Sequence, residues 1–381
     1  MDLVQLLKCA VERKASDLHL KVGTPPILRI DNRLVALPDQ PRLTQDAVLA
    51  AVSAILTPKQ MERFQERNEI DLAHSLPNLG RFRVNIFRQR GMVGIVLRVI
   101  PVRIQTIAEL HLPPILERLA LEPRGMILVT GTTGSGKSST LAAMIDHINA
   151  NRSGHVLTIE DPIEFLHRDK RSLINQREVG ADTASFGDAL RSALRQDPDV
   201  ILVGEMRDYE TISTALVAAE TGHLVLSTLH TLDATETVNR IISVFPPFQQ
   251  KQIRLQLAAV LKGIVSQRLI PRSDGKGRVP AVEVCVATGT VRECIIDSDK
   301  TRTLTDVIAA GVSQYGMQTF DQSLMLLYRK SLISYEEALL WCSNPDDFAL
   351  KVRGVESAAD ATWQAGGQEE PPADIPGMTR F

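Results

Sequence analysis

The 381-residue sequence contains few aromatic residues and no excess of charge of either sign. Aromatic residues make up 4% of the chain, so the stacked rings that bind single-stranded nucleic acids are scarce. The formal net charge is −2, which leaves no general basic excess to neutralise a nucleic-acid backbone. We therefore expect no nucleic-acid partner.

The sequence also lacks closely spaced cysteine pairs and long apolar runs. No pair among the four cysteines has the Cys-x-x-Cys spacing of zinc sites and thioredoxin-like sites, so we expect free thiols in a reducing cytosol. No run of about 18 apolar residues is present, and the first residues do not resemble a signal peptide. We therefore predict no membrane span, although 44% hydrophobic residues allow a sizeable core.

The most informative segment is Gly131–Ser138, with the sequence GTTGSGKS. It matches G-x-x-x-x-G-K-[ST], the phosphate-binding loop of nucleoside triphosphatases. The apolar run 126–130 before it is typical of a buried strand, and apolar residues after it recur at helical spacing. In this arrangement, backbone N–H groups and the helix N-terminus bind phosphate.

This pattern assigns roles to the residues of the loop. Lys137 is predicted to bind the β- and γ-phosphates and Ser138 to ligate Mg²⁺, so the expected cofactors are ATP and Mg²⁺. The alternative is a Gly/Ser turn that ends in an exposed lysine, which the flanking strand and helix disfavour. The predicted nucleotide-binding residues are Thr133, Gly134, Ser135, Gly136, Lys137, Ser138 and Ser139.

Carboxylates follow two further apolar runs. Glu205 comes after the run 200–203, at the strand end where α/β sheets present ligand-binding groups. Gly204 occupies a place that is commonly acidic, so Glu205 must act on Mg²⁺ alone or with help from elsewhere. The acids of segment 158–165 could hold Mg²⁺ through water or orient an attacking water. The alternatives are a solvated acid after a strand and an acidic turn before a proline.

His230 directly follows a third segment that is typical of a buried strand, 222–229. It is a candidate for a hydrogen bond to the γ-phosphate, and the alternative is a structural histidine at a strand end. No Ser–His–Asp arrangement accompanies it, so we do not expect a nucleophilic hydrolase.

A predicted pair of strands near residues 81–100 is rich in arginine, including Arg83 and Arg98. These arginines either form a solvated basic face or supply an arginine finger to the triphosphate of a neighbouring subunit.

The order of predicted elements suggests an α/β protein with two domains. Residues 1–100 fit an α+β domain with helices near 44–56 and 58–67, and residues 101–112 a linker. In residues 113–354 strands alternate with helices, which predicts a parallel sheet covered on both faces. After about residue 250 we expect mainly helices, including 251–269, 318–331 and 334–342. The Ala-, Gly-, Glu- and Pro-rich residues 355–381 are expected to be disordered.

These segments together resemble the secretion ATPase superfamily, and within it the type IV pilus retraction ATPases. The resemblance covers residues 1–354. It rests on seven blocks in order, namely 15–19 (ASDLH), 80–85 (GRFRVN), the phosphate loop, 158–165, 197–205, 222–231 and 316–321 (GMQTFD).

The resemblance implies a PAS-like N-terminal α+β domain followed by a RecA-like P-loop ATPase domain with a helical C-terminal part. It implies that Glu164 activates water, that Glu205 supports Mg²⁺ and that His230 reads the γ-phosphate. Arg83 and Arg98 match the arginines that the family places between subunits. The expected assembly is a homohexamer.

The function implied is an ATP-driven motor for pilus retraction and twitching motility. The ring is expected in the cytoplasm, peripheral at the cytoplasmic face of the inner membrane, bound to a pilus platform protein. A paralogous pilus ATPase is a further candidate partner. The first alternative is a pilus assembly or type II secretion ATPase, which usually has a four-cysteine zinc site and a longer N-terminal extension. Others are a RecA-like DNA translocase and a non-catalytic ring subunit, and intact Lys137, Glu164 and Glu205 disfavour the latter.

Overall fold

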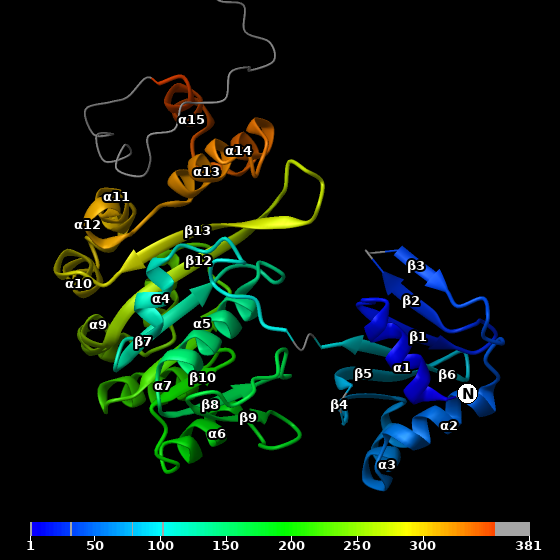
Figure 1. Ribbon diagram of the computed structural model, residues 1–381. Coiled ribbons are helices and arrows are strands. Elements are labelled where there is room, and N and C mark those ends of the chain that lie inside the picture. The colour runs from blue at the N-terminus through cyan, green and yellow to red at the C-terminus, as the bar shows by residue number, and fades with distance from the viewer. Residues whose placement is uncertain (1, 31–32, 78, 101–102, 355–381) are drawn as a thin grey trace, which may run out of the picture. The chain divides into compact units, whose positions relative to one another are not determined.

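The computed structural model describes residues 2–30, 33–77, 79–100 and 103–354, which form two compact units (Figure 1). The first unit runs through Ile104 and also includes the segment Pro162–Leu166. The second unit contains Gln105–Asp161 and the chain from His167 onward. The predicted disordered tail, 355–381, lies outside the described residues.

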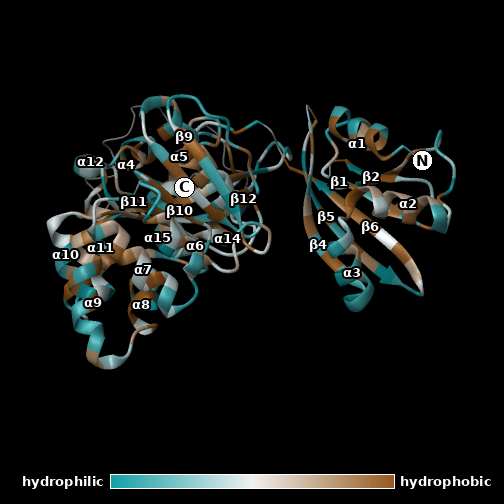
Figure 2. Cartoon of the chain, turned by 90° about the horizontal axis from the view of Figure 1, so that it is seen from below, coloured by the Kyte–Doolittle hydropathy of each residue, from teal (hydrophilic) through white to brown (hydrophobic). Residues whose placement is uncertain are grey.

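The first unit contains an antiparallel sheet with the strand order β3-β2-β1-β6-β5-β4. Apolar and polar residues alternate along β5, and the strands of this unit carry brown and teal bands in the hydropathy colours of Figure 2. Phe82, Val84 and Ile86 are buried, whereas Arg83 lies on the opposite face and is exposed. Within the described residues, the strands are β1 (Asp17–Lys21), β2 (Ile27–Ile30), β3 (Arg33–Ala36), β4 (Glu69–Leu76), β5 (Gly80–Gln89) and β6 (Met92–Val99).

Three helices supply the apolar residues that pack with this sheet, namely α1 (Leu3–Glu12), α2 (Gln45–Ile55) and α3 (Pro58–Arg67). Each begins at a side-chain cap, because Asp2, Thr44 and Thr57 accept hydrogen bonds from backbone N–H groups of the first turn. The helices predicted at 44–56 and 58–67 are therefore confirmed.

The second unit contains a sheet with the order β13-β12-β7-β11-β10-β8-β9. All neighbouring strands are parallel except β13, which is antiparallel to β12. The carboxyl ends of the parallel strands therefore meet at one edge of the sheet. As described, the strands are β7 (Gly125–Thr130), β8 (His155–Glu160), β9 (Leu173–Glu178), β10 (Val200–Val203), β11 (Leu224–Leu229), β12 (Leu261–Pro271) and β13 (Arg278–Val286).

Helices cover both faces of this sheet, because every residue of β7 is buried and successive side chains pack alternately into two different cores. Ile127 and Val129 pack in one core with α4 (Ile115–Ala120) and α5 (Lys137–Asn151). Met126 and Leu128 pack in another core, with α6 (Phe186–Ala193), α7 (Tyr209–Glu220), α8 (Ala234–Ser243) and α9 (Pro247–Val260).

The last helices of the unit follow β13. The final three, α13 (Phe320–Arg329), α14 (Tyr335–Trp341) and α15 (Pro345–Val352), share a core with β12 and β13, and α13 and α14 confirm two predictions. Before them come α10 (Gly289–Ile296), η1 (Thr301–Thr303), α11 (Leu304–Ala310) and α12 (Val312–Tyr315). In the described ranges, no helix is long and apolar enough to cross a membrane.

The helix predicted over 251–269 is wrong in its second half. Helix α9 ends at Val260 and β12 begins at Leu261, because an apolar run that is buried on both faces fits either element. A Cβ at Gly263 would approach Leu119 Cδ1 to 3.0 Å, which explains a glycine there. Residues 105–112, expected in a linker, group with the second unit, where Ile107 and Leu112 are buried.

Candidate functional site

The predicted phosphate loop connects β7 to α5. Gly136 caps α5 in a left-handed conformation, and no side chain accepts hydrogen bonds from the first turn of the helix. In contrast, Asp208 and Asp233 cap α7 and α8. The first N–H groups of α5 therefore lack side-chain acceptors at the positive end of the helix dipole, which favours an anion.

The loop requires glycine at Gly131 for a steric reason. This residue has φ +139°, and a Cβ there would lie 2.5 Å from the Gln267 carbonyl oxygen and 2.6 Å from Ser135 Oγ. Gly134 has φ +80° but open space around it. The loop thus leaves room for a ligand at its tip, while its base packs tightly on β12.

Lys137 and Ser135 lie inside this loop. Lys137 Nζ donates hydrogen bonds to the carbonyl oxygens of Gly131 and Thr132, at 2.8 and 3.0 Å. Ser135 Oγ is buried and has no hydrogen-bond partner within the described residues. Burying a hydroxyl without a hydrogen-bond partner costs free energy, and a phosphate oxygen could accept a hydrogen bond from this hydroxyl. Ser138 and Ser139 are half-buried in the first turn of α5, and Thr133 is exposed at the loop tip. These residues therefore fit a nucleotide phosphate.

Glu205 and His230, which were predicted from separate segments, lie together beside the loop. They follow the neighbouring parallel strands β10 and β11, and His230 Nε2 lies 3.8 Å from Glu205 Oε2. Glu205 also pairs with Arg207. Burial, followed by the positive charges of Lys137 and Arg207, lowers the pKa of His230. His230 is therefore expected to be neutral near pH 7, with one ring nitrogen that donates and one that accepts.

The glycine before Glu205 also has a steric cause. A Cβ at Gly204 would lie 3.1 Å from the Ile159 carbonyl oxygen and 3.4 Å from Glu160 Cα on the adjacent strand β8. An acidic side chain at position 204 would therefore crowd β8.

Sequence reasoning gave less weight to Glu160 than its position merits. This residue ends β8, the strand next to β10, and accepts hydrogen bonds from Thr158 Oγ1 at 2.6 Å and Gln176 Nε2 at 3.1 Å. Its place at a strand end was the signal that could have identified it.

Glu164 is exposed and lies in Pro162–Leu166, which belongs to the first unit. The predicted role of Glu164 stays a prediction.

The two candidate arginines, Arg83 and Arg98, are direct neighbours across β5 and β6, where they pair in register. Arg98 is 65% exposed, and its Nε donates to Oδ1 of the buried Asp17 at 3.0 Å. Arg29 Nε lies 3.6 Å from Asp17 Oδ2. Arg98 therefore has an ionic partner within its own unit, whereas Arg83 is exposed.

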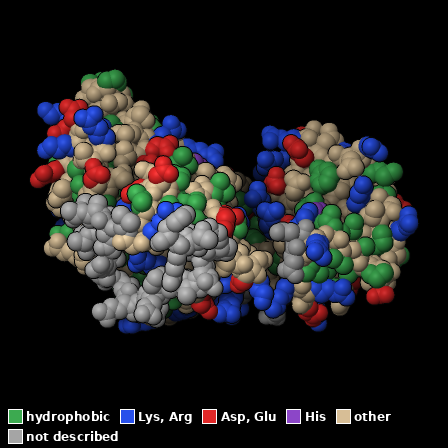
Figure 3. Space-filling model, turned by 90° about the horizontal axis from the view of Figure 1, so that it is seen from above, with side chains coloured by type: hydrophobic (Ala, Val, Ile, Leu, Met, Phe, Trp, Pro, Cys, Tyr) green, Lys and Arg blue, Asp and Glu red, His purple; other side chains and the backbone are tan. Residues whose placement is uncertain are grey.

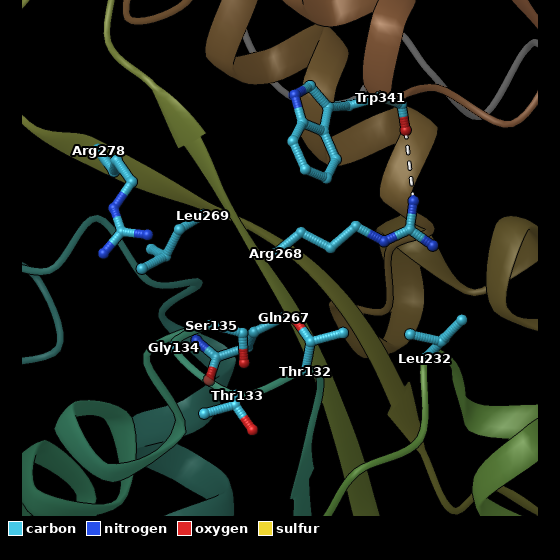
Figure 4. Close-up of a pocket in the computed structure, with 10 residues that line it drawn as sticks. All are labelled: Thr132, Thr133, Gly134, Ser135, Leu232, Gln267, Arg268, Leu269, Arg278 and Trp341. Carbon is cyan, nitrogen blue, oxygen red and sulfur yellow. Dashed lines mark hydrogen bonds between the residues drawn. The ribbon is translucent and has the colours of Figure 1, made fainter.

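A cavity of about 370 Å³ opens beside the phosphate loop (Figure 4). Thr132–Ser135 line one side, Gln267–Leu269 of β12 line another, and Leu232, Arg278 and Trp341 complete the wall. Arg268 donates a hydrogen bond to the Trp341 carbonyl oxygen at 3.3 Å, drawn as a dashed line in Figure 4. Sequence reasoning missed these lining residues on β12–α14, because the segment of β12 was predicted to be a helix.

In the part of the chain that the structure describes, no group of three His, Cys, Asp or Glu side chains could hold a metal ion. Basic and acidic side chains are interspersed on the face shown in Figure 3.

Comparison with known proteins identifies the family. The family described as "Type II/IV secretion system protein" matches residues 2–313. The chain belongs to this family. It is 46% identical over 348 residues to the type IV pilus retractation ATPase PilT of Pseudomonas aeruginosa, covering 91% of this chain and 100% of PilT. It is 42% identical over 361 residues to the type IV pilus ATPase PilU of the same bacterium, covering 94% of each protein.

A solved structure agrees with these relatives. The crystal structure of the pilus retraction motor PilT with bound ADP superposes with a TM-score of 0.84 at 45% identity, covering 91% of this chain and 98% of that chain. The mixed α/β fold of this chain is therefore that of the PilT structure. The predicted membership of the type IV pilus retraction ATPases is confirmed.

Proposed function

We propose that this chain hydrolyses ATP with Mg²⁺ to power the retraction of type IV pili. The observation that carries the proposal is the phosphate loop with its buried Lys137 and unpaired Ser135, placed beside Glu205 and His230. The relatives named as pilus retraction ATPases support the mechanical role.

The residues of the second unit divide the chemistry among them. Lys137 exchanges its two loop carbonyls for phosphate oxygens, and the N–H groups of the loop and of α5 bind the same anion. Ser138 and Glu205 would hold Mg²⁺, partly through water. When bound, ATP with Mg²⁺ supplies the phosphoanhydride bond whose cleavage releases energy.

The remaining proposed residues act on the γ-phosphate. The neutral His230 donates a hydrogen bond there, and Glu164 accepts a proton from the attacking water. Arg83 and Arg98 of a neighbouring copy stabilise the negative charge that develops during transfer. On this proposal hydrolysis requires assembly.

We propose a PAS-like first unit, a RecA-like second unit and a homohexameric ring. The ring would work at the cytoplasmic face of the inner membrane against a pilus platform protein. Similarity to PilU supports a paralogous ATPase as a second partner. A pilus assembly or type II secretion ATPase is the less supported alternative, since relatives named for secretion match at lower identity over less of the chain.

The test is Mg²⁺-dependent ATP hydrolysis by the full chain over a range of protein concentrations. Activity per subunit should rise with concentration and be lost in Glu164→Ala and Arg83→Ala. Glu117→Ala, which removes an exposed carboxylate on α4, is the matched control and should keep wild-type activity. Hydrolysis that is independent of concentration, down to concentrations where sedimentation shows monomers, would refute the shared site. Absent hydrolysis would refute the ATPase itself.

A further inference from the structure

One buried carboxylate has no role in the chemistry above. Glu283 on β13 is 4% exposed and lies opposite Ser266 of β12. Buried acids are rare unless another group requires them, so the contacts of this side chain are informative.

Glu283 connects two loops of the site. Its Oε1 accepts the backbone N–H of Ala234, the first residue of α8, at 2.8 Å. The Ser266 hydroxyl donates a hydrogen bond to the same carboxylate and accepts one from Thr130 Oγ1 at 3.0 Å. Thr130 ends β7 directly before Gly131, the first residue of the phosphate loop. Ser266 and Thr130 are fully buried.

The other end of this connection is the short loop that carries His230. Within that loop, Leu232 N donates to Glu236 Oε2 at 2.7 Å, and the hydroxyls of Thr231 and Thr237 lie 2.6 Å apart. These bonds tie the loop to its own helix. The Glu283 bond to Ala234 joins that helix to β13, and the Ser266 hydroxyl continues the connection to Thr130 at the end of β7.

Some of the groups around Glu283 stabilise a negative charge on its carboxylate, and others oppose it. The N-terminus of α8 and Arg268 of β12 attract its negative charge, whereas Asp233 at the same helix end repels it. Burial has the largest effect and raises the pKa of Glu283 to about 7. Cys285, the other titratable neighbour on β13, stays a neutral thiol because burial raises its pKa.

We propose that Glu283 is a positioning residue for ATP hydrolysis, because it holds the His230 loop and the strand before the phosphate loop in one fixed relation. This inference rests on the function proposed above. It assigns Glu283 to the recognition of the γ-phosphate, while binding of the α- and β-phosphates depends on the phosphate loop itself.

The test compares ATP hydrolysis and nucleotide affinity in the full chain. Glu283→Ala should lower kcat by about tenfold to a hundredfold, as expected for a displaced catalytic group. It should weaken binding of a non-hydrolysable ATP analogue and leave ADP affinity unchanged. Glu283→Gln should keep most of the wild-type kcat near neutral pH, because the amide oxygen of glutamine still accepts a hydrogen bond from the Ala234 N–H.

Ser323→Ala is the matched control for lost stability. Ser323 Oγ of α13 accepts the backbone N–H of Val282, the residue before Glu283, at 3.0 Å and is buried. This variant should be destabilised but should keep the wild-type kcat and the preference for the ATP analogue over ADP. Equal losses in Ser323→Ala and Glu283→Ala would overturn the proposal. So would an unchanged kcat in Glu283→Ala, or an equal loss of affinity for both nucleotides.

Two outcomes separate this inference from the function it rests on. If the wild type does not hydrolyse ATP, the proposed function fails, while the affinities for ATP analogue and ADP still test Glu283. If Glu283→Ala does not fold, Glu283→Leu, which cannot accept the N–H but fills the site, takes its place.

Discussion

Two glycines of the phosphate loop allow backbone strain to be separated from steric overlap. Gly131 and Gly134 both have positive φ, at +139° and +80°, so alanine is strained at either position. Only at Gly131 would the new Cβ meet other atoms, the Gln267 carbonyl oxygen at 2.5 Å and Ser135 Oγ at 2.6 Å. Nothing lies within 4 Å of a Cβ at Gly134.

The magnitudes follow from these contacts. Positive φ costs a non-glycine residue about 1–2 kcal/mol, which is the whole expected loss for Gly134→Ala. At Gly131 overpacking adds about 1–3 kcal/mol, and the contact with a backbone oxygen places the effect toward the upper end. We therefore expect Gly131→Ala to lose about 4 kcal/mol of unfolding free energy.

The assay is urea unfolding of the full chain without nucleotide, followed by circular dichroism. Gly277→Ala provides a control outside the site, because φ is +88° there and a Cβ again meets nothing within 4 Å. Gly277→Ala and Gly134→Ala should lose similar amounts, and Gly131→Ala should lose clearly more. Equal losses in all three variants would refute the steric argument.

Three further predictions concern charged groups. Lys137→Ala should abolish ATP hydrolysis and weaken ATP binding by about tenfold or more, since each charged hydrogen bond contributes about 1.5–3 kcal/mol. Calorimetry measures the ATP affinity, and a wild-type affinity in this variant would contradict the prediction. Asp17→Ala should lower the free energy of unfolding by about 1 kcal/mol, because Arg98 loses its ionic partner but is 65% exposed and stays hydrated, and an unchanged urea midpoint would contradict the pairing. Burial raises the pKa of Glu283 above its ordinary value, to about 7, so the folded state holds a proton that the unfolded chain releases. The free energy of unfolding should therefore fall by about 3 kcal/mol between pH 4.5 and 7. Urea unfolding across this pH range measures the fall, and Glu283→Gln should not show it.

Local patterns were sufficient for the parts of the site that lie within one short segment. The phosphate loop, Glu205 and His230 each follow an apolar run, and a strand end is visible in sequence because polarity changes there. In a parallel sheet these strand ends lie along one edge, so sequence predicts the edge that carries the site.

Other parts of the site depend on which strands are neighbours, and sequence does not show this. Strand β12 lies beside β7 although more than a hundred residues separate them, so the contact between Gln267 and Gly131 was not predictable. The apolar run of β12 also fits a helix, since burial on both faces removes the alternation that distinguishes a strand. Glu283 was missed for the same reason, because its partners come from β12 and α8.

The segment Pro162–Leu166 has a practical consequence for dissecting the protein. Although the second unit surrounds it in the sequence, this segment groups with the first unit. A cut between Ile104 and Gln105 therefore does not divide the chain into its two units. A fragment that begins at Gln105 would retain the segment without the unit to which it belongs, and with it Glu164. Experiments that assign activities to halves of the chain should use point substitutions in the intact protein rather than truncation.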